Sequence, residues 1–134
     1  MSWFYLGKEI VTPPEGAVGF VYILTNKATG KKYVGKKLFW FTKTLPPLKG
    51  AKRKRRRIVE SNWRTYSGSN PETKTIGPDA FHREILHLCA TKSAMSYLET
   101  REIILRDALL RDDFYNGLID VKVGSRGLKQ LTCE

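Results

Sequence analysis

A hairpin signal in the first third of the chain constrains its fold most strongly. Residues 19–25 and 31–35 are expected to form two strands, and they flank a turn-forming sequence that contains Asn, Thr and Gly. In the register that a four-residue loop would set, Tyr22 pairs with Tyr33. Directly paired residues share a face of the sheet, because side chains alternate along a strand. The hairpin therefore predicts two phenol rings side by side.

The residues between these positions supply the other face of the hairpin. Val21, Ile23 and Val34 would point away from the phenols and join a hydrophobic core. Aromatic cross-strand pairs are common in hairpins for packing reasons alone. The two tyrosines are therefore either a structural pair or part of a site, and the hairpin alone supports both interpretations.

Length and composition predict one domain without a membrane segment. A chain of 134 residues is long enough to bury a substantial core. It lacks the run of about eighteen apolar residues that spans a membrane, and no basic-then-apolar leader is visible. The two cysteines, Cys89 and Cys133, suggest neither a disulfide framework nor a zinc site. A reducing, cytoplasmic setting is expected.

The net charge of +11 predicts an anionic partner. The run KGAKRKRRR at residues 49–57 carries seven positive charges and no acidic residue, so a net charge of +4 remains outside it. Cations at this density attract nucleic acid through its phosphates and release counterions. The alternatives are a solvated loop and a nuclear-localisation signal. Because the excess persists outside the run, contact with nucleic acid is the expectation.

Apolar periodicity predicts helices at residues 55–66 and 93–110, and it leaves residues 81–88 open between a helix, the second candidate along the chain, and a strand. Ser93 would be the N-cap of the last helix. Residues 36–45 fit either a short helix or a continuing strand. Beta-branched residues are sparse in the second predicted helix, so propensity favours a helix over a strand there.

The expected organisation is a single folded domain with two appendages. An N-terminal arm over residues 1–17 precedes the domain, which spans residues 18–123. A basic insertion at residues 46–57 lies within the domain. The tail over residues 124–134 is polar and glycine-containing, and we expect it to be flexible.

Two carboxylates on the last predicted helix are candidates for chemistry. On a helical wheel Glu99 lies at the border of the apolar face and Glu102 lies within it. The alternative for either is an ion pair, such as that of Glu102 with Arg106 four residues later. His82 and His87 share neither a helical face nor a strand face, and we expect ordinary structural roles for them. No GxxxxGK[ST] or GxGxxG motif occurs, so no nucleotide cofactor is expected.

Tyrosines, cations and a carboxylate are the groups that metal-assisted phosphodiester cleavage requires. Their arrangement in this chain resembles that of the GIY-YIG nuclease family. Phe20-Val-Tyr22 and Tyr33-Val-Gly35 stand in the places of the two motifs that name the family. Leu98-Glu-Thr-Arg-Glu-Ile103 is similar to the LExxxI pattern of the family's metal-binding helix, and Tyr115-Asn116 resembles the Tyr-Asn that follows it. The resemblance spans residues 18–118.

The resemblance implies an α/β fold of the α+β type, with a central three-stranded antiparallel sheet flanked by helices. In the family a third strand precedes the glutamate helix. Residues 81–88 are therefore expected to form that strand, against their propensity.

The resemblance also implies a metal-dependent endonuclease that hydrolyses DNA phosphodiester bonds. Its cofactor would be Mg²⁺, with Mn²⁺ as an alternative, and its partner would be DNA. The compact, stand-alone form is similar to phage or mobile-element enzymes. A cytoplasmic location is expected, in the host cell if the chain is phage-encoded, and the chain would be a monomer or a homodimer. The alternatives are a catalytically impaired DNA-binding module of the same fold and a basic, RNA-binding structural protein.

The family's roles can be assigned to residues of this chain. Tyr22 would help to activate the attacking water, as a general base or within a relay. Tyr33 would orient the water or the phosphate. Glu99 would be the single protein ligand of the metal, with Glu102 as the alternative, and Asn116 would support the loop beneath the site.

The cationic residues carry the main departures from the family. Lys43 stands where the family has an arginine, and a lysine lacks the planar fork that pairs with a phosphate. Lys36, Lys37 or Arg64 are alternatives for this role. Phe20 replaces the first glycine of the GIY motif. The residues expected to contact nucleic acid are Lys36, Lys37, Arg53, Arg55, Arg56, Arg57 and Arg64.

One further segment is a candidate for the border of the predicted site. Residues 62–69 form a hydroxyl-rich turn after an arginine. Side chains and backbone N–H groups of such a turn can hold a phosphate. The alternative is an ordinary helix end with a glycine stop, and the sequence supports both interpretations.

Overall fold

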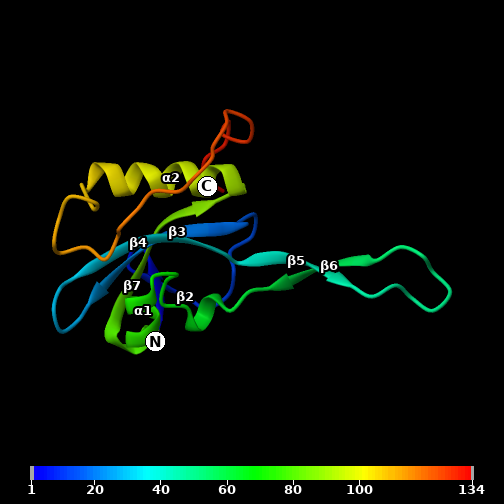
Figure 1. The fold of residues 1–134 in the computed structure, drawn as a ribbon, viewed down its shortest axis with the longest axis horizontal. Coiled ribbons are helices and arrows are strands. Elements are labelled where there is room, and N and C mark those ends of the chain that lie inside the picture. Colours follow the sequence, from blue (N-terminus) through cyan, green and yellow to red (C-terminus); the bar gives the residue numbers. More distant parts are fainter. Residues whose placement is uncertain (1, 134) are drawn as a thin grey trace.

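The computed structural model describes residues 2–133, and its centre is a five-stranded mixed sheet (Figure 1). The strands lie in the order β2-β1-β7-β3-β4. The first strand runs parallel to β7, and every other neighbouring pair is antiparallel. Their bounds are β1 Trp3–Tyr5, β2 Lys8–Ile10, β3 Gly19–Asn26, β4 Lys32–Leu38 and β7 Phe81–Cys89.

The sheet has two strands more than the three predicted, because the N-terminal segment joins it. β1 pairs with β7 through Trp3 and Arg83. The Trp3 side chain is buried and packs edge-on against Phe20 and Tyr22, with ring centroids 4.9 and 5.2 Å apart. Burying a tryptophan stabilises the fold by a few kcal/mol, on the order of 2–3. The aromatic residues of the arm thus attach its backbone to the sheet edge.

The β3–β4 hairpin forms as predicted, but in a different register. Tyr33 pairs with Leu24, and Tyr22 pairs with Gly35. The turn is longer than expected, because the Asn26 carbonyl oxygen accepts a hydrogen bond from the Gly30 N–H. Gly30 itself adopts a φ of 75°, a conformation that favours glycine. A shift of two residues preserves the faces of the strands. The phenols therefore still share a face, as diagonal neighbours with ring centroids 6.3 Å apart.

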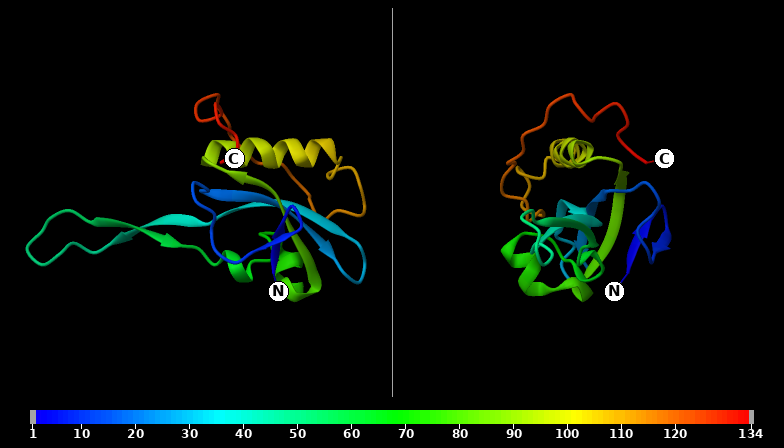
Figure 2. Two further views of the ribbon diagram at one scale, coloured as in Figure 1. Left: turned by 180° about the vertical axis from the view of Figure 1, so that it is seen from behind. Right: turned by 90° about the vertical axis from the view of Figure 1, so that its right-hand side faces the viewer.

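One face of the sheet is covered by helix α2, Lys92–Leu105 (Figure 2). Val21, Ile23 and Val34 pack against it, as the sequence predicted. The helix is shorter than the predicted 93–110. Its N-cap is Thr91 rather than Ser93, because the Thr91 side chain accepts from Ala94 N–H. No helix in residues 2–133 is long and apolar enough to cross a membrane.

The opposite face is covered by three short helical segments, η1 Trp63–Thr65, α1 Pro71–Ile76 and η2 Pro78–Ala80. Trp63 is buried there and packs on Phe39 and Phe20. The sheet is therefore enclosed on both sides, and both of its faces are apolar.

Residues 81–88 form strand β7, as the family resemblance implied and against their propensity. Tyr22 pairs with Ile85, whereas Val21 pairs with His87, so Leu86 is an extra residue in a β-bulge. Beyond the bulge the alternation of faces shifts by one residue. Phe81, Ile85 and Leu88 therefore share one face, and their spacing imitates a helix.

The predicted helix at residues 55–66 is wrong. Residues 55–60 form strand β6, Arg55–Glu60, which pairs antiparallel with β5, Trp40–Leu45. This resolves the open choice for residues 36–45 in favour of strands. The β5–β6 hairpin extends far from the body of the molecule, and the basic run lies at and beside its tip (Figure 1).

The projecting hairpin should be dispensable for folding. We predict that replacing residues 41–59 by Asn-Gly, a tight turn between the paired residues Trp40 and Glu60, leaves a cooperatively folded body. All but two of the removed residues are exposed. Thermal unfolding followed by circular dichroism should shift by less than about 5 °C, corresponding to less than about 1 kcal/mol. Loss of a cooperative transition would show that the hairpin belongs to the folding unit.

Candidate active site

A cavity of about 520 Å³ opens beside the edge strand β4. Residues from both faces of the sheet meet there, because β4 has no further strand beside it. The C-terminal segment after α2 supplies the remaining wall. The lining includes Tyr33, Lys36, Tyr66, Ser69, Asn70, Glu99, Asn116 and Asp120.

Tyr33 is the predicted tyrosine that reaches this cavity. Its side chain is half-buried, and its hydroxyl lies 2.9 Å from the Ser69 hydroxyl. Burial raises the pKa of Tyr33, and the hydrogen bond with Ser69 opposes that increase. A neutral phenol in this position can donate or accept a hydrogen bond, and so can orient a water molecule or a phosphate oxygen.

Tyr22 lies beneath the cavity rather than in its wall. The side chain is fully buried, between the rings of Tyr33 and Tyr66. Tyr66 lies close enough to influence its hydroxyl, yet that hydroxyl makes no hydrogen bond of ordinary geometry within residues 2–133. Burial raises the pKa of Tyr22 well above 10, so the phenol stays protonated at neutral pH.

Gly35 makes this arrangement of rings possible. A Cβ atom at position 35 would overlap the Tyr22 hydroxyl and lie 2.6 Å from Tyr22 Cζ and 3.0 Å from Tyr33 Cε2. Only glycine lets the β4 backbone approach the Tyr22 ring so closely. The glycine of the Tyr33-Val-Gly35 motif is thus required by the buried tyrosine on the neighbouring strand.

Glu99 enters the cavity from α2, on the other side of β4. No hydrogen bond or ion pair engages its carboxylate within the part of the chain that the structure describes. Burial raises the pKa of Glu99, and the positive charge of Lys36 lowers it in part. A partly desolvated carboxylate with free oxygens is suited to receive a cation.

Glu102 has a different role. Its carboxylate lies 2.9 Å from His87 Nε2 and 3.1 Å from Arg106 Nε. This is the ion pair with Arg106 that the sequence offered as an alternative, and it also connects α2 to β7. Of the two candidate carboxylates, Glu99 faces the cavity and Glu102 is occupied by its neighbours.

The donors around Glu99 fit a hard divalent cation. Within residues 2–133, no group of three or more His, Cys, Asp or Glu side chains is placed to hold a metal ion. Glu99 would therefore be the main protein ligand, and water and phosphate oxygens would complete the shell. The cavity is large enough for both, and its remaining lining is rich in hydroxyl and amide oxygens.

Asn116 holds the edge strand at the centre of the site. Its side-chain amide donates to Val34 O at 2.8 Å and accepts from Val34 N at 3.0 Å. It thereby satisfies the free hydrogen-bonding edge of β4 as a neighbouring strand would. Tyr115 N–H donates to Lys32 O at 2.7 Å, and Asn70 donates to Tyr115 O at 3.2 Å. The two sides of the cavity are thus tied together.

The predicted cations are divided among three locations. Lys36 lines the cavity and donates to Ser96 at 2.7 Å, while Lys37 lies 4.1 Å above the Tyr66 ring. Lys43 lies on β5, paired with Arg57 on the projecting hairpin, and does not line the cavity. The structure therefore does not bring Lys43 to Tyr33 and Glu99. The hairpin also carries Arg53, Arg55, Arg56 and Arg57, all exposed.

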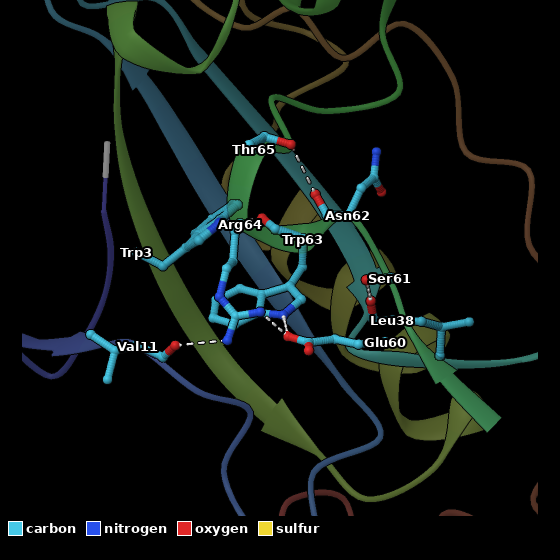
Figure 3. A network of polar contacts seen from close by, with 9 residues as sticks. All are labelled: Trp3, Val11, Leu38, Glu60, Ser61, Asn62, Trp63, Arg64 and Thr65. Atoms are coloured by element: carbon cyan, nitrogen blue, oxygen red, sulfur yellow. Dashed lines mark hydrogen bonds and ion pairs between the residues drawn. The ribbon is translucent and has the colours of Figure 1, made fainter.

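Arg64 belongs to a network at the base of the hairpin (Figure 3). It pairs with Glu60, donates to Val11 O at 2.9 Å and packs over the Trp63 ring. Glu60 also accepts from Trp63 Nε1 at 2.7 Å. These intramolecular contacts give Arg64 a structural role at the base of the hairpin, and its contact with nucleic acid stays a prediction.

Sequence reasoning assigned no individual role to some residues of this region. Tyr66 and Ser69 line the cavity, and the hydroxyl-rich turn at residues 62–69 was the signal for them. Arg83 had no signal, because it lies between His82 and Glu84 and its burial cannot be read from these polar neighbours. It donates to Tyr66 O at 2.9 Å and lies 4.5 Å from the Trp3 ring, and burial lowers its pKa to about 10. Arg83 thus helps to position the backbone of Tyr66.

Comparison with known proteins gives one family for this arrangement. The family model described as "Putative endonuclease segE, GIY-YIG domain" matches residues 3–119. No curated protein and no solved structure matches the chain. The matched region contains the whole cavity lining through residue 119, and also the projecting hairpin.

The close approach of Gly35 to Tyr22 can be tested directly. We predict that Gly35→Ala destabilises the fold by about 1–3 kcal/mol, because the added methyl group overlaps the phenol. Tyr22→Phe alone should leave stability within about 1 kcal/mol, since its buried hydroxyl lacks a well-formed hydrogen bond. The double variant should recover part of the loss in urea denaturation. Strict additivity of the two changes would show that the contact does not limit the fold.

The burial of Glu99 should reduce stability. Its pKa is raised on folding, so the folded state binds the proton more tightly and loses stability as the pH rises through the titration of Glu99. We predict that Glu99→Gln melts at a higher temperature than the natural chain at pH 8 without metal. The difference should vanish below about pH 4, where the carboxyl is protonated in both states.

Glu102→Gln is the matched control for this measurement. It removes the partner of His87 and Arg106, and should cost about 1 kcal/mol at the same pH. A lower melting temperature for Glu99→Gln at pH 8 would contradict the assignment of Glu99 as the unpaired carboxylate.

Proposed function

We propose, from the premise that this chain belongs to the GIY-YIG nuclease family, that it is a divalent-metal-dependent endonuclease acting on DNA. The reaction is hydrolysis of a phosphodiester bond. The supporting observation is the convergence of the Glu99 carboxylate and the Tyr33 hydroxyl on one cavity, from opposite faces of the sheet edge. Nothing in the chain's own contacts occupies that carboxylate within residues 2–133.

The proposed cofactor is Mg²⁺, with Mn²⁺ as an alternative, and Glu99 would hold it. When bound, such an ion stabilises the negative charge that develops on the phosphate. The remaining work falls to residues of the chain. Tyr33 and Ser69 hydrogen-bond to the water or the phosphate and orient it, and Lys36 adds a positive charge beside them.

Tyr22 acts in this proposal as a positioning residue. A buried phenol with a raised pKa is a poor general base at neutral pH. Packed beneath Tyr33 and Tyr66, it fixes the orientation of both rings. Burial and the raised pKa argue against direct proton abstraction by Tyr22, one of the two roles that the family resemblance implied.

Lys36 takes over the position proposed for the family arginine. Lys43 is on the outer hairpin, whereas Lys36 lines the cavity and is close enough to Glu99 to lower its pKa. Lysine supplies charge without a planar fork, so its contact with phosphate is less directional.

A single cavity handles one strand at a time, and a double-strand break would require two protomers or two encounters.

A second candidate is a DNA-binding module of the same fold with impaired catalysis. The outlying position of Lys43 and the full burial of Tyr22 favour it. A third, a basic RNA-binding structural protein, is favoured by charge alone. Both make predictions that differ from those of the nuclease.

Cleavage of supercoiled plasmid separates these candidates. We predict nicking in the presence of Mg²⁺ or Mn²⁺ and none in EDTA. Glu99→Gln should reduce the rate by about 100-fold or more while leaving DNA affinity within about threefold, because it removes the metal ligand and no phosphate contact. Glu84→Gln, a carboxylate on β7 outside the cavity, is the control and should cleave normally.

Two results would point elsewhere. Binding of plasmid without any cleavage under either metal would favour the impaired module. Tighter binding to structured RNA than to duplex DNA, unaffected by Glu99→Gln, would favour the RNA-binding protein.

A further inference from the structure

We infer that the β5–β6 hairpin is an arm that enters the minor groove of duplex DNA beside the cleaved phosphate and bends the duplex there. The residues that would wedge between base steps are Pro46, Pro47 and Leu48 at the turn after β5. This inference rests on the proposed DNA substrate, and it adds a groove, a wedge and a deformation to that proposal.

The positive charge of the hairpin favours a polyanionic partner that contacts both of its faces. Residues 41–59 contain eight lysines and arginines and no acidic residue. None of these cations is in a salt bridge within residues 2–133. Lys43 and Arg57 are directly paired across the strands, and so are Thr44 and Arg56. Successive pairs point to opposite faces, so both faces of the ribbon are cationic.

The hairpin is a narrow ribbon that projects from the body of the molecule (Figure 1). It is a two-stranded ribbon of six residues per strand, about 20 Å long, and all of residues 41–59 except Leu45 and Val59 are exposed. A lone ribbon of this kind is marginally stable in water. The phosphates on either side of a DNA groove would neutralise its charge and support both strands.

The side chains of the ribbon favour the minor groove. Reading of bases in the major groove relies largely on Asn, Gln and Arg side chains that form paired hydrogen bonds. Residues 41–59 contain neither Asn nor Gln, and of these three side chains only arginine is present, at positions 53, 55, 56 and 57. Arginine and lysine, by contrast, are attracted by the strong negative potential of the minor groove without reading a particular sequence. The composition therefore indicates a sequence-tolerant contact.

The apolar side chains that would insert between base steps lie at the turn of the hairpin. Leu48 is 59% exposed, although it lies in a strongly basic segment. The turn is ordered by two contacts, from Ala51 N–H to Leu48 O at 2.8 Å and from Arg55 Nε to Pro46 O at 3.2 Å. Proline and leucine are among the side chains that minor-groove proteins insert between base steps, which kinks the duplex. An exposed apolar tip on a cationic ribbon combines both features.

The base of the hairpin fixes its direction relative to the cavity. Ser61 Oγ donates to Leu38 O, and Glu60 engages both Trp63 and Arg64 (Figure 3). A second hollow, of about 390 Å³, begins at Lys36 in the cavity wall and reaches Phe41 at the start of the hairpin. One cationic path thus leads from Glu99 to the arm, and the bend would lie on one side of the cut.

The test uses the full-length Glu99→Gln chain and a duplex labelled at both ends with a fluorescent donor and acceptor. Binding should bend the duplex by tens of degrees, the range that apolar wedges produce. Leu48→Ser should reduce the change in energy transfer at least about twofold, with the Kd within about threefold, because the phosphate contacts remain. Leu110→Ser, an exposed leucine outside the hairpin, is the control and should not alter the bend.

Groove-specific competitors complete the test. Netropsin, which occupies the minor groove of A·T-rich DNA, should raise the apparent Kd about tenfold, and methyl green, which occupies the major groove, should not. Displacement by methyl green alone, or a duplex that stays straight when bound, would overturn the inference.

Plasmid cleavage by the natural chain is measured separately. Cleavage without bending would contradict the proposed role of the hairpin and support the proposed nuclease activity. Bending without cleavage would support the role of the hairpin and contradict the nuclease activity.

Discussion

The contact between the Tyr22 ring and the backbone of Gly35 is the constraint on which the site depends. It places a large aromatic ring under the edge strand, at the point where that strand has no side chain. The rings of Tyr33 and Tyr66 then pack around Tyr22 and face the cavity. Because interiors are close-packed, a change at this contact would propagate to each ring above it. A glycine and a tyrosine on neighbouring strands thus set the floor of the site.

The edge position of β4 explains how the two halves of the site meet. Tyr33 and Lys36 point to opposite faces of the same strand, since they are an odd number of residues apart. The first therefore meets Ser69 on one side, and the second meets Ser96 on the other. A central strand would separate these groups by the sheet itself. Asn116 satisfies the exposed edge without closing it, and this keeps the cavity open.

The sequence predicted the parts of the site that local alternation controls. The shared face of Tyr22 and Tyr33 survived an error of two residues in the register, because the face of a strand depends on parity and not on exact pairing. Strand β7 could not be recognised from its own residues. Its bulge at Leu86 gives the apolar positions a helical spacing, and only the order of motifs in the family indicated a strand.

The errors around the basic insertion have a different origin. The sequence of residues 55–60 has no strong alternation, and it becomes a strand because β5 lies beside it. Such pairing depends on the opposite strand more than on intrinsic preference. The same error misplaced Lys43, since its distance along the chain from Tyr33 says nothing about a strand that leaves the body. The structural contacts of Arg64 were not foreseen, because Val11 lies far from it in the sequence and Glu60 was assigned to a helix.

Stability and chemistry oppose each other at two positions of the site. The Tyr22 hydroxyl is buried without a well-formed hydrogen bond, and the Glu99 carboxylate is partly desolvated without an ion pair. Both arrangements cost free energy in a protein that only folds. Glu102, one helical turn away, is by contrast paired with His87 and Arg106. Both side chains lie at or beneath the cavity, where the metal ion, water and phosphate that we propose would be bound.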